Sequence, residues 1–207
     1  MDAFKSYLSE KLKKELPGKK AHIEAAPFRR IDFSAEELMQ ARKSAVLILF
    51  YKKNNEIHLV LIQRPKYDGV HSGQIALPGG KVEKTDRDIN HTALREAYEE
   101  VGIVMEDVEV LTQLTDIYIP VSKFIVTPVI GLINYSPQFK IDKHEVEELI
   151  ELKLADLTRI EKLEIATIKM ANGGLLETPC YNFNDKIVWG ATALILNELR
   201  WVLRSDS

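Results

Sequence analysis

The stretch Leu77–Ile103 reads LPGGKVEKTDRDINHTALREAYEEVGI, and the rest of the chain is interpreted outward from it. It opens with a Pro-Gly-Gly turn, passes through a polar loop and ends in a segment with helical spacing. At about 100° per residue, one face of that helix is apolar and carries Leu94, Ala97 and Val101. The stretch therefore predicts a turn, a loop and an amphipathic helix in succession.

Three glutamates, Glu96, Glu99 and Glu100, fall together on a broadly opposite face, because positions three and four apart are neighbours on a helix. Carboxylates this close repel one another and destabilise the helix. A hard divalent cation would offset the repulsion, because Mg2+ prefers carboxylate oxygens and keeps waters or substrate phosphates in its remaining positions. A solvated acidic face is the alternative interpretation, since glutamate-rich faces are common on helices.

This segment resembles the Nudix box, whose family pattern is G-x5-E-x7-R-E-U-x-E-E-x-G-U with U aliphatic. Gly80 opens the pattern, and its helical half is completed by Arg95, Glu96, Glu99, Glu100, Gly102 and Ile103. The chain departs from this pattern at two places. At the intermediate glutamate it has Asp86, which lies one residue further from Arg95 than in the pattern, and at the U position it has the small residue Ala97. The longer spacing is typical of the coenzyme A pyrophosphatase-like members.

The loop ahead of this box also resembles coenzyme A-type members, which carry a pattern close to L-L-T-x-R-S/A-x3-R-x3-G-x3-F-P-G-G. The matching residues are Leu61, Arg64, Gly73, Pro78, Gly79 and Gly80. The departures are Ile62, Pro65, Leu77 and Gly69. Gly69 stands where the pattern has its second arginine, and a glycine cannot bind a phosphate through two hydrogen bonds. The loop therefore supports the branch of the family more firmly than it supports coenzyme A as substrate.

Bulk composition excludes several classes of protein. The chain has 207 residues, of which 45% are hydrophobic and 29% charged, a composition that is ordinary for a globular domain. Its net charge of −3 predicts no basic surface for binding nucleic acid. Cys180 is the single cysteine, so an intramolecular disulfide and a cysteine metal cage are excluded. No apolar signal region or membrane span is expected, and we expect a cytoplasmic protein.

Apolar runs predict four buried strands at Ser44–Tyr51, Ile57–Gln63, Asp107–Leu114 and Phe124–Ile133. The first two are separated by a polar turn and should form an antiparallel pair. Pro128 predicts an edge or a bulge in the last one. Residues 165–170 and 175–181 flank an Asn-Gly-Gly turn and predict a hairpin.

Helical patterns lie near both ends of the chain. Phe4–Leu16 predicts an amphipathic helix ended by Pro17-Gly18, and Val188–Leu203 predicts a closing helix. Ala21–Ala41 reads as irregular apart from a capping box at Ser34 and Glu37, and Tyr118–Pro120 reads as a bend. The start of the closing helix, WGATA from Trp189, resembles the last helix of coenzyme A-type members and is interpreted as core packing.

We therefore expect residues 1–40 to form an N-terminal helix and irregular extension, and residues 41–207 to form a Nudix hydrolase domain. The resemblance and the alternation of strands and helices imply an α/β fold, an α/β/α sandwich around a mixed sheet.

The resemblance also implies roles for individual residues. It makes Glu96, Glu99 and Glu100 ligands of Mg2+ or Mn2+, Glu99 catalytic, and Arg95 the residue that orients the acidic cluster. Glu145 is the matching acid further along the chain, as general base or outer carboxylate, with a solvated acid as the alternative.

Four residues ahead of the helix are candidates for substrate binding. Gly79 and Gly80 would let backbone groups approach the substrate. Arg64 and His71 are candidate substrate-binding residues, with a surface arginine and an ordinary loop histidine as the alternatives.

The implied reaction is hydrolysis of a diphosphate in a small-molecule dinucleotide. Coenzyme A would yield 4′-phosphopantetheine and adenosine 3′,5′-bisphosphate. The alternatives are another nucleoside diphosphate derivative such as ADP-ribose or NADH, or a ligand-sensing module without hydrolysis, against which the intact RExxEE argues. A homodimer is a further possibility.

Overall fold

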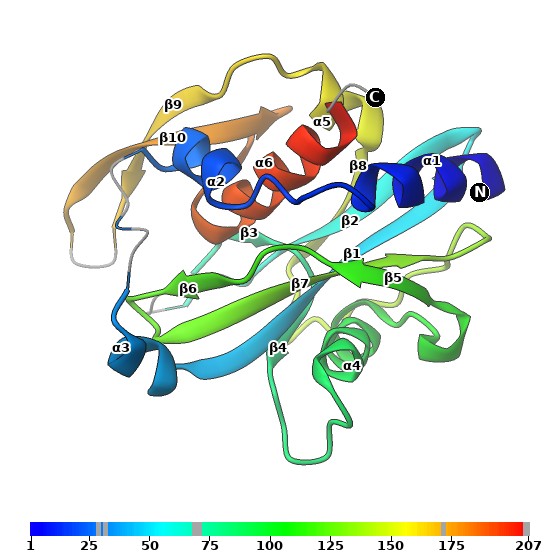
Figure 1. The fold of residues 1–207 in the computed structure, drawn as a ribbon, viewed down its shortest axis with the longest axis horizontal. Helices are drawn as coiled ribbons and strands as arrows, with labels where there is room; N and C mark the ends of the chain where they lie inside the picture. The colour runs from blue at the N-terminus through cyan, green and yellow to red at the C-terminus, as the bar shows by residue number, and fades with distance from the viewer. Residues whose placement is uncertain (28–29, 31–32, 68–71, 171–172, 205–207) are drawn as a thin grey trace.

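A computed structural model describes residues 1–27, 30, 33–67, 72–170 and 173–204. A mixed β-sheet lies between two groups of helices (Figure 1). One face is covered by α4 (Ile89–Val101). The other is covered by α1 (Asp2–Leu12), α2 (Lys19–Ala25), α5 (Leu154–Arg159) and α6 (Gly190–Arg204). The expected α/β sandwich around a mixed sheet is confirmed.

Strand β1 (Arg42–Lys53) is the centre of the sheet. It pairs in parallel with β7 (Phe124–Leu132) and antiparallel with β2 (Glu56–Gln63). Asn54 and Asn55 have left-handed φ values of 51° and 64°, which form the tight turn between β1 and β2. The strand order is β3-β2-β1-β7-β5, in which β3 is Ile75–Ala76 and β5 is Glu109–Gln113, and β8 (Glu148–Lys153) pairs with β2. The expected antiparallel pair is confirmed.

The diglycine turn enters the sheet where β1 and β2 diverge. These strands pair from Phe50 to Lys53 of β1. Beyond that point β3 (Ile75–Ala76) pairs with β2, and β4 (Gly79–Lys81) pairs with β1. The amide of Leu47 donates to the carbonyl of Pro78 at 2.8 Å, so the turn itself is bonded to β1. The sheet thereby holds Gly79 and Gly80 directly beneath α4.

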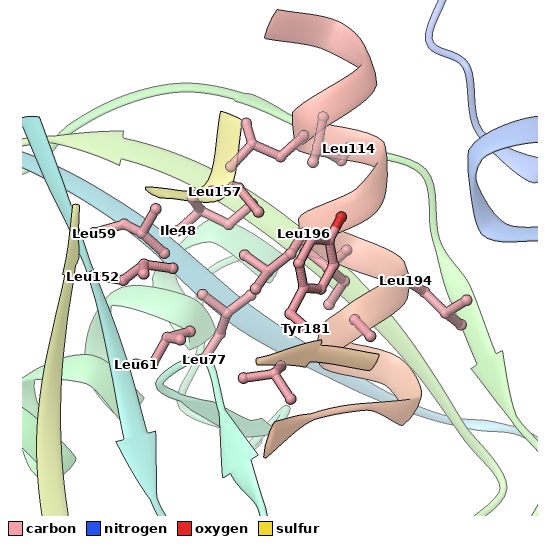
Figure 2. Close-up of a cluster of buried hydrophobic side chains, with 14 of the residues drawn as sticks. Ile48, Leu59, Leu61, Leu77, Leu114, Leu152, Leu157, Tyr181, Leu194 and Leu196 are labelled. Carbon is pink, nitrogen blue, oxygen red and sulfur yellow. The ribbon is translucent and has the colours of Figure 1, made fainter. Parts of the chain in front are cut away.

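Alternating side chains of β1 separate two apolar cores. Leu47, Leu49 and Tyr51 belong to the core beneath α4, together with Ala93, Ala97 and Val101. Ile48 and Phe50 point to the opposite core, beneath α6. Figure 2 shows part of this second core, which contains Ile48, Leu59, Leu61, Leu77, Leu114, Leu152, Leu157, Tyr181, Leu194 and Leu196.

A second, three-stranded sheet follows, formed by β9 (Glu164–Lys169), β10 (Leu175–Phe183) and β11 (Lys186–Val188). β9 and β10 are antiparallel, so the predicted hairpin is confirmed, although Asn172 of its turn lies outside the described residues. Tyr181 of β10 lies in the α6 core, which anchors this sheet to the main one.

Pro128 was expected at an edge or a bulge: the edge is wrong, whereas the pairing of β7 with β5 does contain a register shift, between Val110 and Thr112. Strand β7 is interior, with β1 on one side and β5 (Glu109–Gln113) and β6 (Ile117–Ile119) on the other. The carbonyl of Pro128 accepts from the amide of Leu114 at 2.9 Å, so its backbone faces the break between β5 and β6. Proline is tolerated there because its missing N–H faces no ladder partner.

Three local predictions are corrected by the structure. The first helix ends at Leu12 instead of Leu16, and the segment Tyr118–Pro120, predicted as a bend, begins within β6. The segment 21–41 is not irregular throughout, since it contains part of α2 and all of α3 (Ala35–Met39). Within it, the predicted capping box at Ser34 and Glu37 is confirmed by bonds of 3.1 Å and 2.9 Å. No helix in the described part of the chain is long and apolar enough to span a membrane.

Buried polar bonds attach the N-terminal helices to α6. Arg200 is 2% exposed, donates to Glu24 of α2 at 2.7 Å and to Asn197 at 3.1 Å, and also reaches the carbonyl of Ile160. Leu8 of α1 is fully buried in the α6 core. The N-terminal segment is therefore an integral part of this core.

Arg200→Met is expected to lower the free energy of unfolding by about 3 kcal/mol, because it leaves buried acceptors and Glu24 without their cationic donor. Urea denaturation would measure the change. Arg204→Met is the matched control, since the exposed Arg204 bonds to the carbonyl of Thr158 from the surface and its loss should change stability by less than about 0.5 kcal/mol. Equal effects of the two variants would contradict this account.

Candidate active site

Helix α4 has its two ends fixed by residues suited to those positions. The Asp88 side chain accepts from the amide of His91 at 2.8 Å and caps the first turn. Gly102 ends the helix with a left-handed φ of 72°, and a Cβ there would lie 2.8 Å from the carbonyl oxygen of Lys140. Small Ala97 is 1% exposed against the sheet, which lets the helix approach β1 closely.

Glu100 of α4 is buried above the diglycine turn. Its exposed fraction is 1%, and its Oε2 accepts from the amide of Gly79 at 2.8 Å. Burial raises the pKa of Glu100 to about 8, although Arg64 and the Gly79 amide favour the charged form. The solvated-face interpretation is therefore wrong for Glu100, which faces the protein interior instead of solvent.

Glu96 lies one turn earlier and occupies the space above Gly80. A Cβ on Gly80 would lie 2.4 Å from Oε2 of Glu96, so only glycine leaves room for this carboxylate. Burial raises the pKa of Glu96, and the guanidinium of Arg95, 2.9 Å away, opposes that shift. Glu96 and Glu100 thus stand side by side above the turn, each with its ionised form disfavoured by burial.

Gly79 is required for a different reason. Its φ is 155°, and a Cβ there would lie 2.3 Å from the carbonyl oxygen of Ala45 and 2.5 Å from Cα of Val46. Both atoms belong to the backbone of β1, which cannot move aside without breaking the sheet. Gly79 therefore lets β4 pair with β1, whereas Gly80 leaves room for a carboxylate.

Arg95 is held by Asp86 through two bonds, from Nε to Oδ1 at 2.8 Å and from Nη2 to Oδ2 at 3.0 Å. The Arg95 guanidinium holds the pKa of Asp86 well below its usual range, and Asp86 in turn raises the pKa of Arg95. Asp86 also accepts from the amide of Glu83, from Thr92 Oγ1 at 2.9 Å and contacts His91 Nδ1 at 3.0 Å. Sequence reasoning missed Thr92 and His91, because nothing in their spacing distinguishes them from ordinary first-turn residues.

The anchored Arg95 contacts two carboxylates of the acidic cluster. Its Nη1 lies 3.0 Å from Glu99 and its Nη2 lies 2.9 Å from Glu96. The Glu99 side chain is 49% exposed, far more than Glu96 or Glu100. Arg95 thus holds one partly buried and one accessible carboxylate in fixed positions.

Glu145 is exposed, on a segment that contacts the C-terminal end of α4. The amide of Asp142 donates to the carbonyl of Glu100 at 3.0 Å, and the amide of Glu145 donates to Asp142 at 3.1 Å. The negative charge of Glu145 contributes to the raised pKa values of Glu96 and Glu100, so it lies within electrostatic range of both. The structure thus brings Glu145 to the cluster.

Arg64 completes the described site. Its Nη2 lies 4.0 Å from Oε1 of Glu100 and 3.4 Å from the carbonyl of Gly79, and its side chain is 32% exposed. The guanidinium can therefore face both the buried acid and a ligand above the turn. The predicted residues His71 and Gly69 lie outside the described residues.

A divalent cation fits this site by donor chemistry. The three glutamates offer hard oxygen ligands, and the raised pKa values of Glu96 and Glu100 indicate that positive charge is lacking there. Among the described residues, no three Asp, Glu, His or Cys side chains surround a common point, because Glu96 and Glu99 bond to Arg95 and Glu100 bonds to Gly79. For all three glutamates to bind one cation, the side chains of Glu96 and Glu99 would have to turn away from Arg95.

The fold and the site define an α/β protein whose acidic helix, diglycine turn and arginines suit a cation and a phosphate group. The family model described as "NUDIX domain" matches residues 41–171. The chain belongs to the Nudix hydrolases, enzymes that cleave phosphoric anhydride bonds in nucleoside diphosphate derivatives.

Several known proteins are similar to the chain. It is 39% identical over 169 residues to "Uncharacterized Nudix hydrolase NudL" of Pectobacterium atrosepticum, covering 80% of this chain and 85% of that protein. Identity to the protein of the same name in Salmonella paratyphi B is 35% over 164 residues, covering 79% and 83%. A solved MutT/nudix family protein from Enterococcus faecalis has a TM-score of 0.54 at 17% identity, covering 85% of this chain and 66% of that one, which shows a shared fold.

The stability of the metal-free protein should fall as pH rises, because the buried Glu100 then loses its proton. Its pKa is raised from 4.5 to about 8 on folding, so its contribution is fully present below pH 4.5 and lost as pH rises through 8. The free energy of unfolding in a chelator should drop by a few kcal/mol between pH 5 and pH 8.5, because each pKa unit corresponds to about 1.4 kcal/mol. Urea denaturation of Glu100→Gln should show a clearly smaller drop, and an unchanged pH dependence would refute the assignment.

Two neighbouring glycines should respond differently to the same substitution. Gly79→Ala should lower the free energy of unfolding by about 3 kcal/mol, because the new methyl group meets the β1 backbone. Gly80→Ala should unfold near the wild-type urea concentration yet lower turnover of a diphosphate substrate about 10²-fold, because it displaces the Glu96 carboxylate. Loss of stability in both variants, or full activity of Gly80→Ala, would contradict the separate roles given to these glycines.

Proposed function

We propose that this enzyme hydrolyses the pyrophosphate bond of coenzyme A or its derivatives, with Mg2+ or Mn2+, to 4′-phosphopantetheine and adenosine 3′,5′-bisphosphate. The observation that carries the proposal is the pair Glu96 and Glu100 above the diglycine turn, one partly buried and one fully buried, with Arg64 at 4.0 Å from Glu100. Coenzyme A is favoured by the sequence of the loop after β2 and by the one-residue-longer spacing between Asp86 and Arg95. The single thiol of Cys180 is buried and free, which suits the cytoplasm proposed as the site of the reaction.

In this proposal the two sides of the site bind different parts of the diphosphate. Arg64 donates to phosphate oxygens from the position that follows β2. Glu96, Glu99 and Glu100 would hold the cation, which supplies positive charge to the phosphate oxygens and activates water for attack. Arg95 positions Glu96 and Glu99 without touching the substrate.

Two carboxylates are accessible enough to accept the proton of the attacking water. Glu99 is half-exposed and held by Arg95, whereas Glu145 is exposed on the segment beside the C-terminal end of α4. We assign the base to one of these two residues, because both are more accessible than Glu96, whose side chain is 13% exposed, and Glu100, which is 1% exposed.

A second candidate function is hydrolysis of another nucleoside diphosphate derivative, such as ADP-ribose or NADH. The specific observation in its favour is Gly69, which stands where coenzyme A-type members carry an arginine. Coenzyme A bears an additional phosphate that such an arginine could bind, and ADP-ribose and NADH lack it.

A substrate panel tests the proposal, with coenzyme A, an acyl-coenzyme A, ADP-ribose and NADH each supplied with Mg2+ or Mn2+. We expect coenzyme A to be cleaved most efficiently, with both products identified by mass. Preference for ADP-ribose or NADH would replace the first function by the second, and no turnover of any compound would favour a ligand-binding module.

Glu99→Gln and Glu100→Gln should each lower turnover by about 10²-fold or more while the fold remains intact by circular dichroism. Glu106→Gln is the matched control, since Glu106 is exposed and lies in the short 3-10 helix after α4. Wild-type turnover by either site variant would disprove the assigned metal ligands. A further comparison identifies the base. The pH dependence of turnover is measured for Glu145→Gln and for Glu99→Gln at saturating metal, and the base is the residue whose substitution removes the acidic limb of that profile.

A further inference from the structure

A cavity of about 470 Å³ lies beside the end of β2, outside the acidic cluster. Its walls come from the end of β2 and the following loop, from β9, and from the segment that joins β10 to α6. The residues used in the argument below are Gln63, Ile168, Lys169, Asp185, Lys186 and Trp189. None of them belongs to the sequence motif that identified the acidic site.

The cavity and the acidic site meet at the end of β2. Gln63 is the last residue of β2, and Arg64 follows it directly. Arg64 points toward Glu100, whereas Gln63 accepts from the ammonium of Lys186 at 3.1 Å. The amide of Arg64 donates to the carbonyl of Gln74, which itself lines the cavity. A two-part ligand could therefore place its diphosphate at Arg64 and its remaining part in the cavity.

Trp189 supplies a flat aromatic wall. Its side chain is half-buried and lines the cavity, whereas Ala193 of the same WGATA segment packs in the α6 core. Trp189 lies between the fully buried Val188 of β11 and Gly190, whose left-handed φ of 63° begins α6. The backbone position of Trp189 at the start of α6 is thereby set by the fold.

The charges of the cavity are nearly balanced. Lys186 bonds to Glu148 as well as to Gln63, and the oppositely charged Lys169 and Asp185 both line the cavity. Asp185 is fixed by its amide, which donates to Asn182 at 3.0 Å in a turn with left-handed φ values at positions 184 and 185. A lining without strong net charge suits an uncharged aromatic group better than a second phosphate.

We propose that this cavity binds the nucleobase of the substrate, stacked on Trp189, while the diphosphate lies at Arg64 and the acidic helix. The inference rests on the proposed function for the position of the diphosphate. Stacking on an indole is available to any base, because every base has a π-face. Ile168 adds apolar contact, and Gln63 provides a polar edge for hydrogen bonds.

Tryptophan fluorescence tests the proposal without turnover, because the chain has two tryptophans. Trp201→Phe leaves Trp189 as the reporter, and Trp201 is a surface residue of α6 that bonds to Glu24. With Mg2+ present, ADP should quench the remaining emission in a saturable manner, and inorganic pyrophosphate should leave it unchanged. In the complementary variant Trp189→Phe, ADP should leave the emission of Trp201 unchanged.

Kinetics give an independent measurement. Trp189→Leu should raise KM for the best substrate of the panel roughly tenfold and leave kcat within about twofold, as expected from loss of a stacked base. Trp189→Phe should restore most of the affinity, because a phenyl ring still stacks. Trp201→Phe should retain the wild-type KM.

The failures of the two proposals are distinguishable. Saturable quenching by ADP without cleavage of coenzyme A would overturn the proposed function and support the base site. Cleavage of coenzyme A with no quenching and an unchanged KM in Trp189→Leu would overturn the base site alone. A lower melting temperature of Trp189→Leu with an unchanged KM would show that Trp189 is structural, which also overturns the inference.

Discussion

The close approach of β4 to β1 is the constraint on which the site depends. Gly79 lies so near the β1 backbone that a side chain would overlap Ala45 and Val46, and Gly80 lies equally near the Glu96 carboxylate. Because both positions lack side chains, the turn can lie within the sheet and α4 can lie directly above it. The amide of Gly79 then points at Glu100 and bonds to a carboxylate that has almost no contact with water.

That arrangement concentrates negative charge where charge is poorly solvated. Asp86, Glu96 and Glu99 share one arginine, Arg95, and Glu100 has Arg64 only at 4.0 Å. Asp86 accepts two parallel hydrogen bonds from the Arg95 guanidinium, which lower its pKa. Burial instead raises the pKa values of Glu96 and Glu100. The site therefore lacks positive charge, and the protein accepts this local instability at the place where a cation and a phosphate would relieve it.

The apolar runs and the pattern around Arg95 were sufficient to predict the central strands, α4 and most residues of the site. Sequence reasoning failed where tertiary contacts decide the structure. Helix α2 has the polar sequence KKAHIEA, and it forms against α6 through bonds such as Glu24 to Arg200, which lie 176 residues apart. The pairing of β3 and β4 between diverging strands, and the exposure of Trp189 to a cavity, likewise depend on distant segments that no local periodicity reports.

Chemistry and specificity are separated in this fold by the physical nature of the groups they recognise. The acidic helix, Arg64 and the glycine turn can contact a diphosphate, which is common to all candidate substrates and so cannot distinguish among them. Discrimination must come from contacts with the remainder of the molecule. In the proposed binding mode those contacts come from residues 72–75, the β10–β11 turn and the start of α6, all of which lie outside the segment that holds the acids. A change of substrate within this fold therefore requires changes in those elements and can leave α4 untouched.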